Sequence, residues 1–476
     1  MSIFEELSLK FNNKKCDVLG FGTSNRPLVE LLVSFGAIVT VRDKKEKVLQ
    51  EEITQKLISQ KVCFITGDSY LENISGDYIF RSPGIRADNP EILSALSRGA
   101  ILTSEMELFF EVCPCKIIGI TGSDGKTTTT TITHLLLDTE FKKEGKRMAY
   151  VGGNIGQPLL PLVNEMNEND VAVVELSSFQ LQTMRNSPSR SLITNITPNH
   201  LDWHVDMNEY IDAKRNIYSH GSPEFLAVNA ENRITREIGE NADLPIVYFS
   251  SKKNKYSDIV SELGKKSKAI YEDEKVIYID DGENRKAIIK SSDILLAGRH
   301  NVENYMAAIA LTDRLVSRDT VEQVAKTFRG VPHRLELVRE LNRVRYYNSS
   351  IDSSPTRTEA AIKALDKRPI IICGGYDKNI PFDTLARALC SSVKSVILTG
   401  ATAQKIFDEI LKCEDYSEDK LKVEIEPDFD KAVLRASEQA ESGDIVLLSP
   451  ACASFDVFQN FEKRGERFKE LINNLE

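Results

Sequence analysis

The sequence predicts an α/β protein of three domains, and three observations lead to this prediction. Short runs rich in β-branched residues alternate with helical patterns along almost the whole chain, which is typical of parallel sheets covered by helices. New sets of such runs begin near residue 116 and again near residue 332. The 476 residues also exceed what one hydrophobic core usually contains. We therefore expect domains at residues 1–112, 113–331 and 332–476.

Each expected domain has its own group of strands. In the central domain the strands are followed by a hairpin-rich segment at 269–290 and a helix at 301–315, and the chain ends in a helix at 461–475. The expected strands are 16–22, 37–43, 62–67 and 77–84, then 116–121, 149–153, 171–178, 191–198, 225–231 and 245–250, and finally 343–350, 369–377, 395–400, 422–427 and 444–450.

Composition and charge exclude several classes of protein. Hydrophobic residues make up 41% of the chain and charged residues 28%, which is typical of soluble globular domains. No apolar run approaches the ~20 residues of a membrane span, and the N-terminus has no apolar leader. The net charge of -10 argues against general affinity for nucleic acid. Cys113 and Cys115 lack C-x-x-C spacing, so we expect reduced thiols in a cytoplasmic protein.

The segment GITGSDGKTTT at 119–129 has the pattern of a phosphate-binding loop. It joins an expected strand to an expected helix, and its glycines let backbone N–H groups surround phosphate oxygens. The strict motif has a glycine where Ile120 stands, and a plain turn with a solvated lysine is the alternative. The strand–loop–helix context favours a nucleoside triphosphate. The residues expected around it are Gly122, Ser123, Asp124, Gly125, Lys126, Thr127 and Thr128.

Four polar residues of the central domain lie at or after the ends of its expected strands, or on an expected helix that follows. They are Asn154, Glu175, His200 and Lys214. Ligands gather at the carboxyl ends of the strands in open α/β sheets, so these groups can converge on the loop. A lone histidine is more often structural, and a lone lysine on a helix is more often solvated. Taken together with the loop, they favour a catalytic group that also includes Lys126.

A second glycine turn, Gly20-x-Gly22, lies in the first domain. Asn25 stands where a dinucleotide-binding turn has its third glycine, and Asp43 ends the next expected strand, as a ribose-binding acid does. A redox dinucleotide, a nucleotide diphosphate group and a plain α/β turn remain alternatives here.

Motifs along the chain resemble the Mur ligase family, the ATP-dependent amide ligases of peptidoglycan precursor synthesis. ELSSFQL and LSPACASFD look most like the members that add D-glutamate to UDP-N-acetylmuramoyl-L-alanine. The resemblance implies a Rossmann-like N-terminal domain for the UDP-sugar, a central P-loop ATPase with a parallel sheet, and a C-terminal Rossmann-like α/β domain for the amino acid. The motifs, in order, are GITGSDGKTTT, GGNIG, VVELSSFQL, ITPNHLD, AKRNIY, GRHNVENYMAA, VPHRLE, GGYDK and LSPACASFD.

The resemblance also implies ligands and roles for the matching residues. Thr127 and Glu175 would bind one Mg²⁺, and His200 and a Lys214 carbamylated by CO₂ would bind a second. The ATP site would further include Asn301, Asn304, His333 and Arg334. The UDP-muramoyl substrate would contact Thr23, Ser24, Asp43 and Asn154. D-glutamate would be held by Lys378, Ser454 and Phe461.

One segment departs from the family pattern. Ser349 and Ile351 stand where the family has an Asp and a Lys, so we assign no nucleotide contact to this segment and none to Asp352. The implied reaction is phosphorylation of the substrate carboxylate by ATP, followed by attack of the D-glutamate amine, in a monomer.

Three alternatives remain. A folylpolyglutamate synthase-like ligase would lead straight into the ATPase, whereas about 110 residues of α/β structure come first here. The others are a nucleotide-binding switch without ligation and a dehydrogenase that uses the Gly20-x-Gly22 turn.

Overall fold

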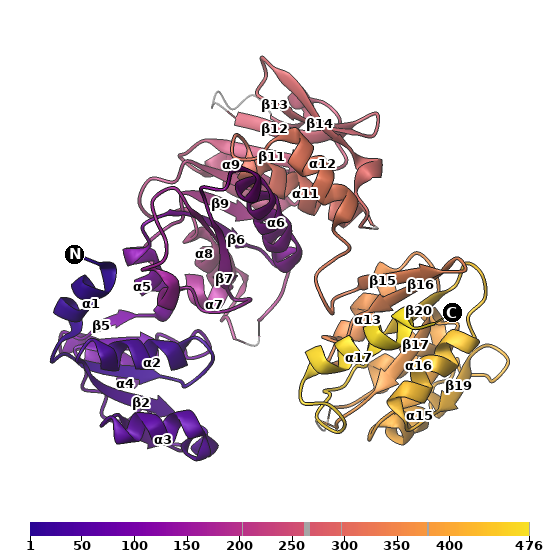
Figure 1. The fold of residues 1–476 in the computed structure, drawn as a ribbon, viewed down its shortest axis with the longest axis horizontal. Helices are drawn as coiled ribbons and strands as arrows, with labels where there is room; N and C mark the ends of the chain where they lie inside the picture. The colour runs from indigo at the N-terminus through magenta and orange to yellow at the C-terminus, as the bar shows by residue number, and fades with distance from the viewer. Residues whose placement is uncertain (202, 261–266, 297, 378–379, 476) are drawn as a thin grey trace. The chain divides into compact units, whose positions relative to one another are not determined.

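The computed structural model describes residues 1–475 except 202, 261–266, 297 and 378–379. The chain forms two compact units, Met1–Thr327 (unit 1) and Phe328–Glu476 (unit 2). Unit 1 contains two sheets and unit 2 contains one (Figure 1). No helix among the described residues combines the length and apolarity needed to cross a membrane. The α/β class predicted from the alternating pattern is confirmed, whereas the boundaries at 112/113 and 331/332 stay a prediction.

The first sheet of unit 1 has five parallel strands in the order β3-β2-β1-β4-β5. The fifth strand was not expected, because its three residues are too few to show a strand pattern. Its strands are β1 (Lys15–Leu19), β2 (Ile38–Asp43), β3 (Cys63–Thr66), β4 (Tyr78–Arg81) and β5 (Ile101–Thr103). Its helices are α1 (Ile3–Phe11), α2 (Asn25–Ser34), α3 (Glu52–Ser59), α4 (Pro90–Ser97) and α5 (Glu105–Val112).

The second sheet of unit 1 has nine strands in the order β14-β13-β12-β11-β10-β9-β6-β8-β7. Strands from β7 to β12 are parallel, and the expected hairpin-rich segment adds β13 and β14 antiparallel at one edge. The strands are β6 (Lys116–Thr121), β7 (Ala149–Gly153), β8 (Val171–Glu175), β9 (Arg190–Ile193), β10 (Phe225–Asn229), β11 (Ile246–Ser250), β12 (Ser267–Asp273), β13 (Val276–Asp280) and β14 (Arg285–Lys290).

Helices cover this sheet, and α6, α11 and α12 pack together on it (Figure 1). The sheet order places β6 between β8 and β9, so the segments that leave these three parallel strands lie next to one another. The helices are α6 (Lys126–Glu144), α7 (Ser178–Leu181), α8 (Met207–Arg215), α9 (Arg233–Asn241), α10 (Tyr256–Ile259), α11 (Arg299–Thr312) and α12 (Arg318–Thr327).

Unit 2 is built on a six-stranded sheet in the order β15-β16-β20-β17-β18-β19. Only β15 is antiparallel to its neighbour, and strands β17, β18 and β20 are buried throughout. The strands are β15 (Glu336–Leu341), β16 (Val344–Asn348), β17 (Ile370–Gly374), β18 (Ser395–Thr399), β19 (Lys422–Ile425) and β20 (Ile445–Leu448). The helices are α13 (Pro355–Ala364), α14 (Asp383–Ser392), α15 (Ala403–Leu411), α16 (Phe429–Glu438) and α17 (Phe461–Asn473).

Candidate functional site

The glycines of the loop between β6 and α6 are required by its geometry. Gly122 has φ of +148°, and a Cβ on it would lie 1.8 Å from the Thr194 Oγ1 atom. Gly125 has φ of +78°, and a Cβ there would lie 2.6 Å from Asn304 Oδ1. Both conformations favour glycine, and both leave the loop backbone packed directly against neighbouring side chains. The loop therefore has one shape, with α6 beginning at Lys126.

Residues that follow β9 brace this loop. Thr194 Oγ1 donates to the Asp124 carbonyl oxygen at 2.6 Å, and the Asp124 amide donates to Asn195 Oδ1 at 3.0 Å. The Ser123 hydroxyl shares a 2.9 Å hydrogen bond with the hydroxyl of Tyr210 on α8. Sequence reasoning missed Thr194, Asn195 and Tyr210. The first two could have been found, because they directly follow a strand whose carboxyl end lies beside β6.

The side-chain nitrogens of two lysines meet at one carbonyl oxygen of the loop. Lys126 Nζ donates to the Gly122 and Ser123 carbonyl oxygens at 2.9 Å each. Lys214 Nζ, from α8, donates to the same Gly122 oxygen at 2.9 Å. The Lys214 side chain is buried, and its Nζ lies 4.6 Å from the centre of the Tyr210 ring. The structure thus brings together two of the four expected catalytic residues.

The pKa of Lys214 is lowered well below its usual value. Burial is the main cause, and the charge of Lys126 acts in the same direction, while Asp124 and Glu175 act against it. The surroundings of Lys214 therefore favour its neutral amine over the ammonium form.

Glu175 ends β8 and is almost fully buried. Its Oε1 accepts a 2.9 Å hydrogen bond from the Asn154 side-chain amide, whereas Oε2 is buried and has no hydrogen-bond partner in the part of the chain that the structure describes. Asn154 is fixed in turn by its backbone amide, which donates to the Glu175 carbonyl oxygen at 2.8 Å. A buried carboxylate oxygen without a partner is suited to a cation.

His200 lies in the turn after β9. Its φ of +55° is left-handed, and its ring centre lies 4.9 Å from that of Phe179 and 6.5 Å from that of Tyr210. Tyr210 is one helical turn before Lys214 and is bonded to the loop residue Ser123. His200 is thus placed on the side of the loop where Lys214 enters.

Asn301 and Asn304 lie in the first turns of α11, beside the loop. Thr129 Oγ1 donates to Asn304 Oδ1 at 3.2 Å, and Asn304 Nδ2 donates to Asn301 Oδ1 at 3.1 Å. A cavity of about 140 Å³ opens next to them. It is lined by Asp124, Gly125, Thr194, Asn195, Asn229, Phe249, His300, Glu303, Asn304 and Ala307. Sequence reasoning missed His300 and Glu303, which follow no strand.

Two segments of the chain match known protein families. Residues 120–312 match the Mur ligase middle domain, and residues 333–452 match the Mur ligase, glutamate ligase domain. Two relatives are both named UDP-N-acetylmuramoylalanine–D-glutamate ligase. The one from Acetivibrio thermocellus is 45% identical over 472 residues, covering 98% of each chain. The one from Clostridium novyi is 44% identical over 474 residues, covering 99% of each. The chain belongs to the Mur ligase family.

Solved structures of Mur ligases share its fold. UDP-N-acetylmuramate–alanine ligase from Thermotoga maritima is 19% identical with a TM-score of 0.53, covering 97% of this chain and 99% of that one. UDP-N-acetylmuramoyl-L-alanyl-D-glutamate–2,6-diaminopimelate ligase is 16% identical with a TM-score of 0.54, covering 98% of this chain and 94% of that one. The predicted fold class is confirmed: a Rossmann-like N-terminal domain, a central ATPase domain and a C-terminal α/β domain.

A Mur ligase is ATP-dependent, and we asked whether the residues present fit Mg²⁺ beside the nucleotide. Within the described ranges, no three His, Cys, Asp or Glu side chains gather as a metal site. Mg²⁺ bound with a nucleotide needs only one or two carboxylates, with phosphate and water oxygens completing the shell. The unpartnered Glu175 oxygen and the half-buried Thr127 at the start of α6 meet that requirement. The donor set therefore fits the ion.

In the N-terminal domain of this Mur ligase, the glycine turn after β1 is held from two sides. Asp43 Oδ2 accepts the Phe21 amide at 2.7 Å. Asn25 Nδ2 donates to the Gly20 carbonyl oxygen at 2.8 Å and to Ser82 Oγ at 3.0 Å. The expected substrate residues Thr23, exposed, and Ser24, half-buried, lie between these two braces.

The expected nucleotide residues of unit 2 lie before β15. His333 has a φ of +62°, and its Nδ1 lies 3.0 Å from the side-chain amide nitrogen of Asn348. Burial is the main cause of its lowered pKa. Arg334 is exposed. Asp352 is buried and accepts the Ser449 hydroxyl at 2.8 Å, so its carboxylate belongs to the interior of unit 2.

The expected amino-acid residues also belong to unit 2. Phe461 begins α17, and its ring centre lies 6.0 Å from that of His333. Ser454 is buried after β20. Arg464, one turn into α17, donates to the carbonyl oxygens of Cys452 and Ala453 at 3.0 Å each and thereby fixes the segment before Ser454. Lys378 lies outside the described residues.

Proposed function

We propose that this Mur ligase adds D-glutamate to UDP-N-acetylmuramoyl-L-alanine at the expense of ATP in peptidoglycan precursor synthesis. The main support is its identity of about 45% to relatives of that name over nearly the whole chain. The observation at the site that supports it best is the meeting of Lys126 and Lys214 at the Gly122 carbonyl, with Glu175 nearby. Lys126 and bound Mg²⁺ would supply the positive charge that a reaction between two anions requires.

The chemical problem is that a carboxylate oxygen is a poor leaving group. A carboxylate oxygen of the substrate attacks the γ-phosphorus, the bond to the ADP oxygen breaks, and an acyl phosphate forms. The amine of D-glutamate then attacks the acyl carbon, the bond to the phosphate oxygen breaks, and the ammonium proton is lost to form the amide. The first step brings an anion onto a polyanion, so placed positive charge dominates the catalysis.

The loop and its lysine have a defined part in this reaction. We assign Gly122, Ser123, Asp124, Gly125, Thr127 and Thr128 to the phosphates of ATP, through their amides and hydroxyls. Lys126 donates hydrogen bonds to the Gly122 and Ser123 carbonyl oxygens. When ATP is present, its side chain extends to the outer phosphates. Mg²⁺ supplies further positive charge to the phosphate oxygens when bound, held by Thr127, Glu175, His200 and Lys214.

Lys214 takes its part as a carbamate. Its neutral amine adds to the carbon of CO₂ and loses a proton, which gives a buried anion that has two oxygens. The lowered pKa of Lys214, and the lack of a hydrogen bond from it to any carboxylate among the described residues, support this modification. A protonated Lys214 would repel Mg²⁺, whereas the carbamate provides oxygen ligands of the kind that the ion prefers.

The remaining residues are assigned to the three ligands. Asn301 and Asn304, beside the cavity of unit 1, are assigned to ATP. His333 and Arg334 are also assigned to ATP. Thr23, Ser24, Asp43 and Asn154 contact the UDP-muramoyl substrate, and Lys378, Ser454 and Phe461 hold D-glutamate. We place the reaction in the cytoplasm, where ATP and UDP-sugars are available. The enzyme acts as a monomer, because one chain supplies every residue named; a dimeric mass in sedimentation would contradict this.

The direct test is phosphate release from ATP by the purified protein with UDP-N-acetylmuramoyl-L-alanine and a panel of amino acids. Release should require both the UDP-substrate and D-glutamate, and Lys126→Ala should abolish it. Hydrolysis of ATP with neither substrate would favour a nucleotide switch instead. Release with a folate substrate, or oxidation of a nicotinamide, would favour the other two alternatives.

A further inference from the structure

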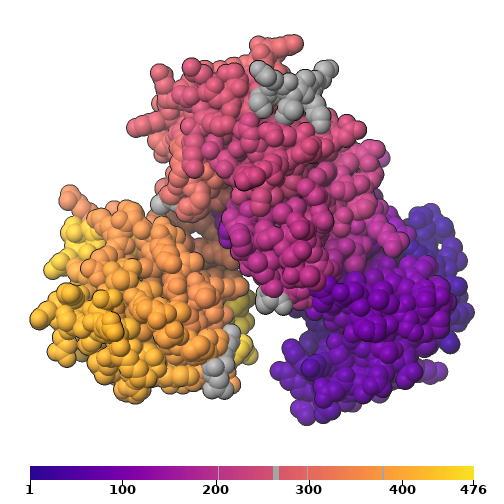
Figure 2. Space-filling model, turned by 180° about the vertical axis from the view of Figure 1, so that it is seen from behind, coloured from indigo at the N-terminus to yellow at the C-terminus, as the bar shows by residue number. Residues whose placement is uncertain are grey.

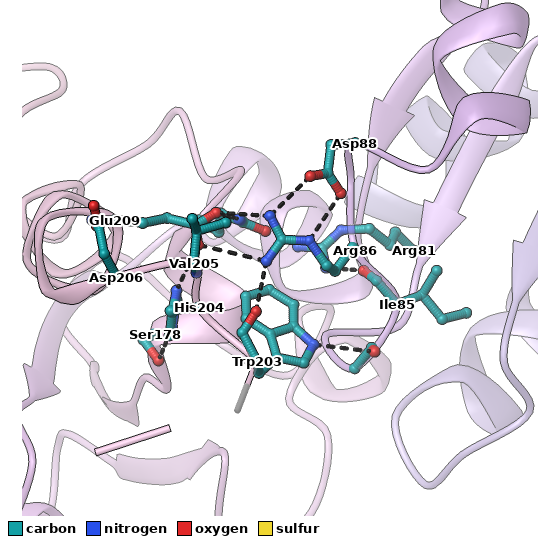
Figure 3. Close-up of polar contacts among 12 residues, drawn as sticks. Arg81, Ile85, Arg86, Asp88, Ser178, Trp203, His204, Val205, Asp206 and Glu209 are labelled. Atoms are coloured by element: carbon teal, nitrogen blue, oxygen red, sulfur yellow. Dashed lines mark hydrogen bonds and ion pairs between the residues drawn. The ribbon is translucent and has the colours of Figure 1, made fainter. Parts of the chain in front are cut away.

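A loop of the first sheet, residues 82–88 after β4, contacts Trp203 and Glu209 in the domain of the second sheet (Figure 3). Trp203 follows His200 by three residues. The space-filling view shows the surfaces of the N-terminal and central parts of unit 1 in contact (Figure 2). We call residues 82–88 the bridging loop. No role has been assigned to it so far.

Arg86 is the centre of this contact. Its guanidinium makes a paired interaction with Asp88 at 2.9 and 2.8 Å, and a second one with Glu209 of α8 at 2.9 and 3.4 Å. It also donates to the Trp203 carbonyl oxygen at 2.6 Å and lies 5.1 Å from the centre of the Trp203 ring. In return, Trp203 Nε1 donates to the Gly84 carbonyl oxygen at 3.4 Å. Forked bonds to carboxylates fix orientation as well as distance.

Trp203 belongs to the same turn as His200. The backbone amides of Trp203 and His204 both donate to the His200 carbonyl oxygen, at 3.1 and 2.9 Å. The rings of His200, Trp203 and His204 all pack around Phe179, with ring centres 4.9, 4.5 and 5.6 Å from its own. Whatever holds Trp203 therefore also holds the backbone that positions the imidazole of His200.

Arg81, at the end of β4, ties the bridging loop to the segment after Glu175. Its side chain is buried and donates to the Ile85 carbonyl oxygen at 2.5 Å. It also donates to the Phe179 carbonyl oxygen at 2.9 Å and to Thr183 Oγ1 at 3.0 Å. The bridging loop is thus connected to both segments that supply candidate metal ligands.

The other end of the bridging loop touches the glycine turn assigned to the UDP-substrate. Ser82 Oγ accepts a hydrogen bond from Asn25, and a Cβ on Gly20 would lie 2.5 Å from that oxygen. The Ser82 amide donates to the Leu19 carbonyl oxygen at 2.9 Å. One short segment therefore contacts the substrate turn of the first sheet and the His200 turn of the second.

We propose that Arg86 is a positioning residue, which acts through Trp203 and Glu209 to hold the His200 turn in the geometry that Mg²⁺ and ATP require. This role rests on the proposed function. Through Arg86, the domain of the first sheet helps to position the proposed metal ligands, although none of its own residues is assigned as a ligand. Residues that orient metal ligands typically affect metal affinity or activity by about 10- to 100-fold.

Trp203 offers a direct readout, because it is the only tryptophan of the chain. In ligand-free protein, Arg86→Ala should shift the tryptophan emission to longer wavelength and increase its quenching by acrylamide, since the cation no longer covers the ring. Arg98→Ala is the matched control. Arg98 belongs to the domain of the first sheet, and its side chain donates to Ser94 Oγ and to the Ile74 carbonyl oxygen of that same domain. Emission unchanged in Arg86→Ala would show that the contact does not exist in solution.

The second readout is the affinity for magnesium and nucleotide. Arg86→Ala should weaken binding of ADP in the presence of Mg²⁺ by about tenfold or more in calorimetry, and should raise the Mg²⁺ concentration for half-maximal phosphate release. The KM for D-glutamate should change less than twofold. Arg86→Lys retains the positive charge but not the forked guanidinium. Its ADP affinity and its Mg²⁺ requirement should lie between those of the wild type and Arg86→Ala. This variant keeps the test valid if Arg86→Ala misfolds.

The outcomes separate the two proposals. If the wild type releases phosphate as proposed but Arg86→Ala and Arg86→Lys match Arg98→Ala in Mg²⁺ dependence, the positioning role is wrong. If Arg86→Ala lowers kcat with unchanged dependence on Mg²⁺, Arg86 does not act on the metal site, and the role is also wrong. If the wild type releases no phosphate with D-glutamate, the proposed function fails, and the loss of ADP affinity in Arg86→Ala still decides whether Arg86 supports the nucleotide site.

Discussion

Substitution of Gly122 by alanine is the perturbation whose effect can be worked out most fully from the structure. The new Cβ would lie 1.8 Å from Thr194 Oγ1 and 3.1 Å from the Thr194 amide nitrogen, which is backbone and cannot rotate away. The backbone φ of +148° is also unfavourable for any residue with a Cβ. The loop must therefore change shape.

The expected cost has two parts. A positive φ of this kind costs about 1–3 kcal/mol, and turning Thr194 away sacrifices its hydrogen bond to Asp124, about 0.5–1.5 kcal/mol. At about 1.4 kcal/mol per factor of ten, the sum corresponds to a loss of ADP affinity between roughly tenfold and a thousandfold. Part of the cost can instead appear as a lower Tm, so both quantities are measured.

The assay is calorimetric titration with ADP and Mg²⁺, together with thermal unfolding. Gly145→Ala is the control, because Gly145 ends the same helix with φ of +69° and has open space where its Cβ would lie. Adding Thr194→Ala to Gly122→Ala should recover part of the affinity, since one of the clashing atoms is removed. An ADP affinity and a Tm for Gly122→Ala equal to those of Gly145→Ala would refute the packing that we derive for the loop.

Three further predictions concern the lysines. Lys214→Ala should be severely impaired and partly restored by a short-chain carboxylate, and wild-type activity in that variant would exclude the carbamate. In CO₂-free buffer, Lys214 has a lower pKa in the folded than in the unfolded protein. At a pH between these two pKa values, the unfolded protein therefore binds more protons than the folded protein, and the free energy of unfolding should rise with pH in that range. The Tm of the wild type relative to that of Lys214→Met should therefore rise with pH. A Tm difference that does not change with pH would contradict this effect of Lys214. Lys378→Ala should raise the KM for D-glutamate far more than that for ATP, and an unchanged KM would show that the amino acid binds elsewhere.

The strand, glycine turn and helix start of the loop between β6 and α6 could be predicted from the sequence because their requirements are local. A buried strand, two glycines, a lysine and a helix start follow one another within about ten residues, and the backbone of such a segment has few alternatives. The placement of Asn154 and Glu175 at one edge of the sheet could also be predicted, because parallel strands bring their carboxyl ends to one edge. Neither prediction needed the order of the strands.

What the sequence did not reveal depends on contacts between distant elements. Tyr210 lies in an unremarkable helix, and its importance comes from its packing between Ser123, His200 and Lys214. Arg86 is one of many arginines, and its forked bonds form only once two separate sheets meet. Strand β5 has three residues, too few for any pattern. Such features follow from tertiary packing, which local sequence does not encode.

Activation of the UDP-substrate carboxylate by ATP, as an acyl phosphate, is the step on which the proposed reaction depends. It is tested most directly with UDP-N-acetylmuramoyl-L-alanine whose carboxylate carries ¹⁸O in both oxygens. Mass spectrometry of the phosphate released with D-glutamate should find one ¹⁸O atom per phosphate, because the bond that breaks last joins the acyl carbon to that oxygen. Phosphate without ¹⁸O, formed while amide accumulates, would contradict the account.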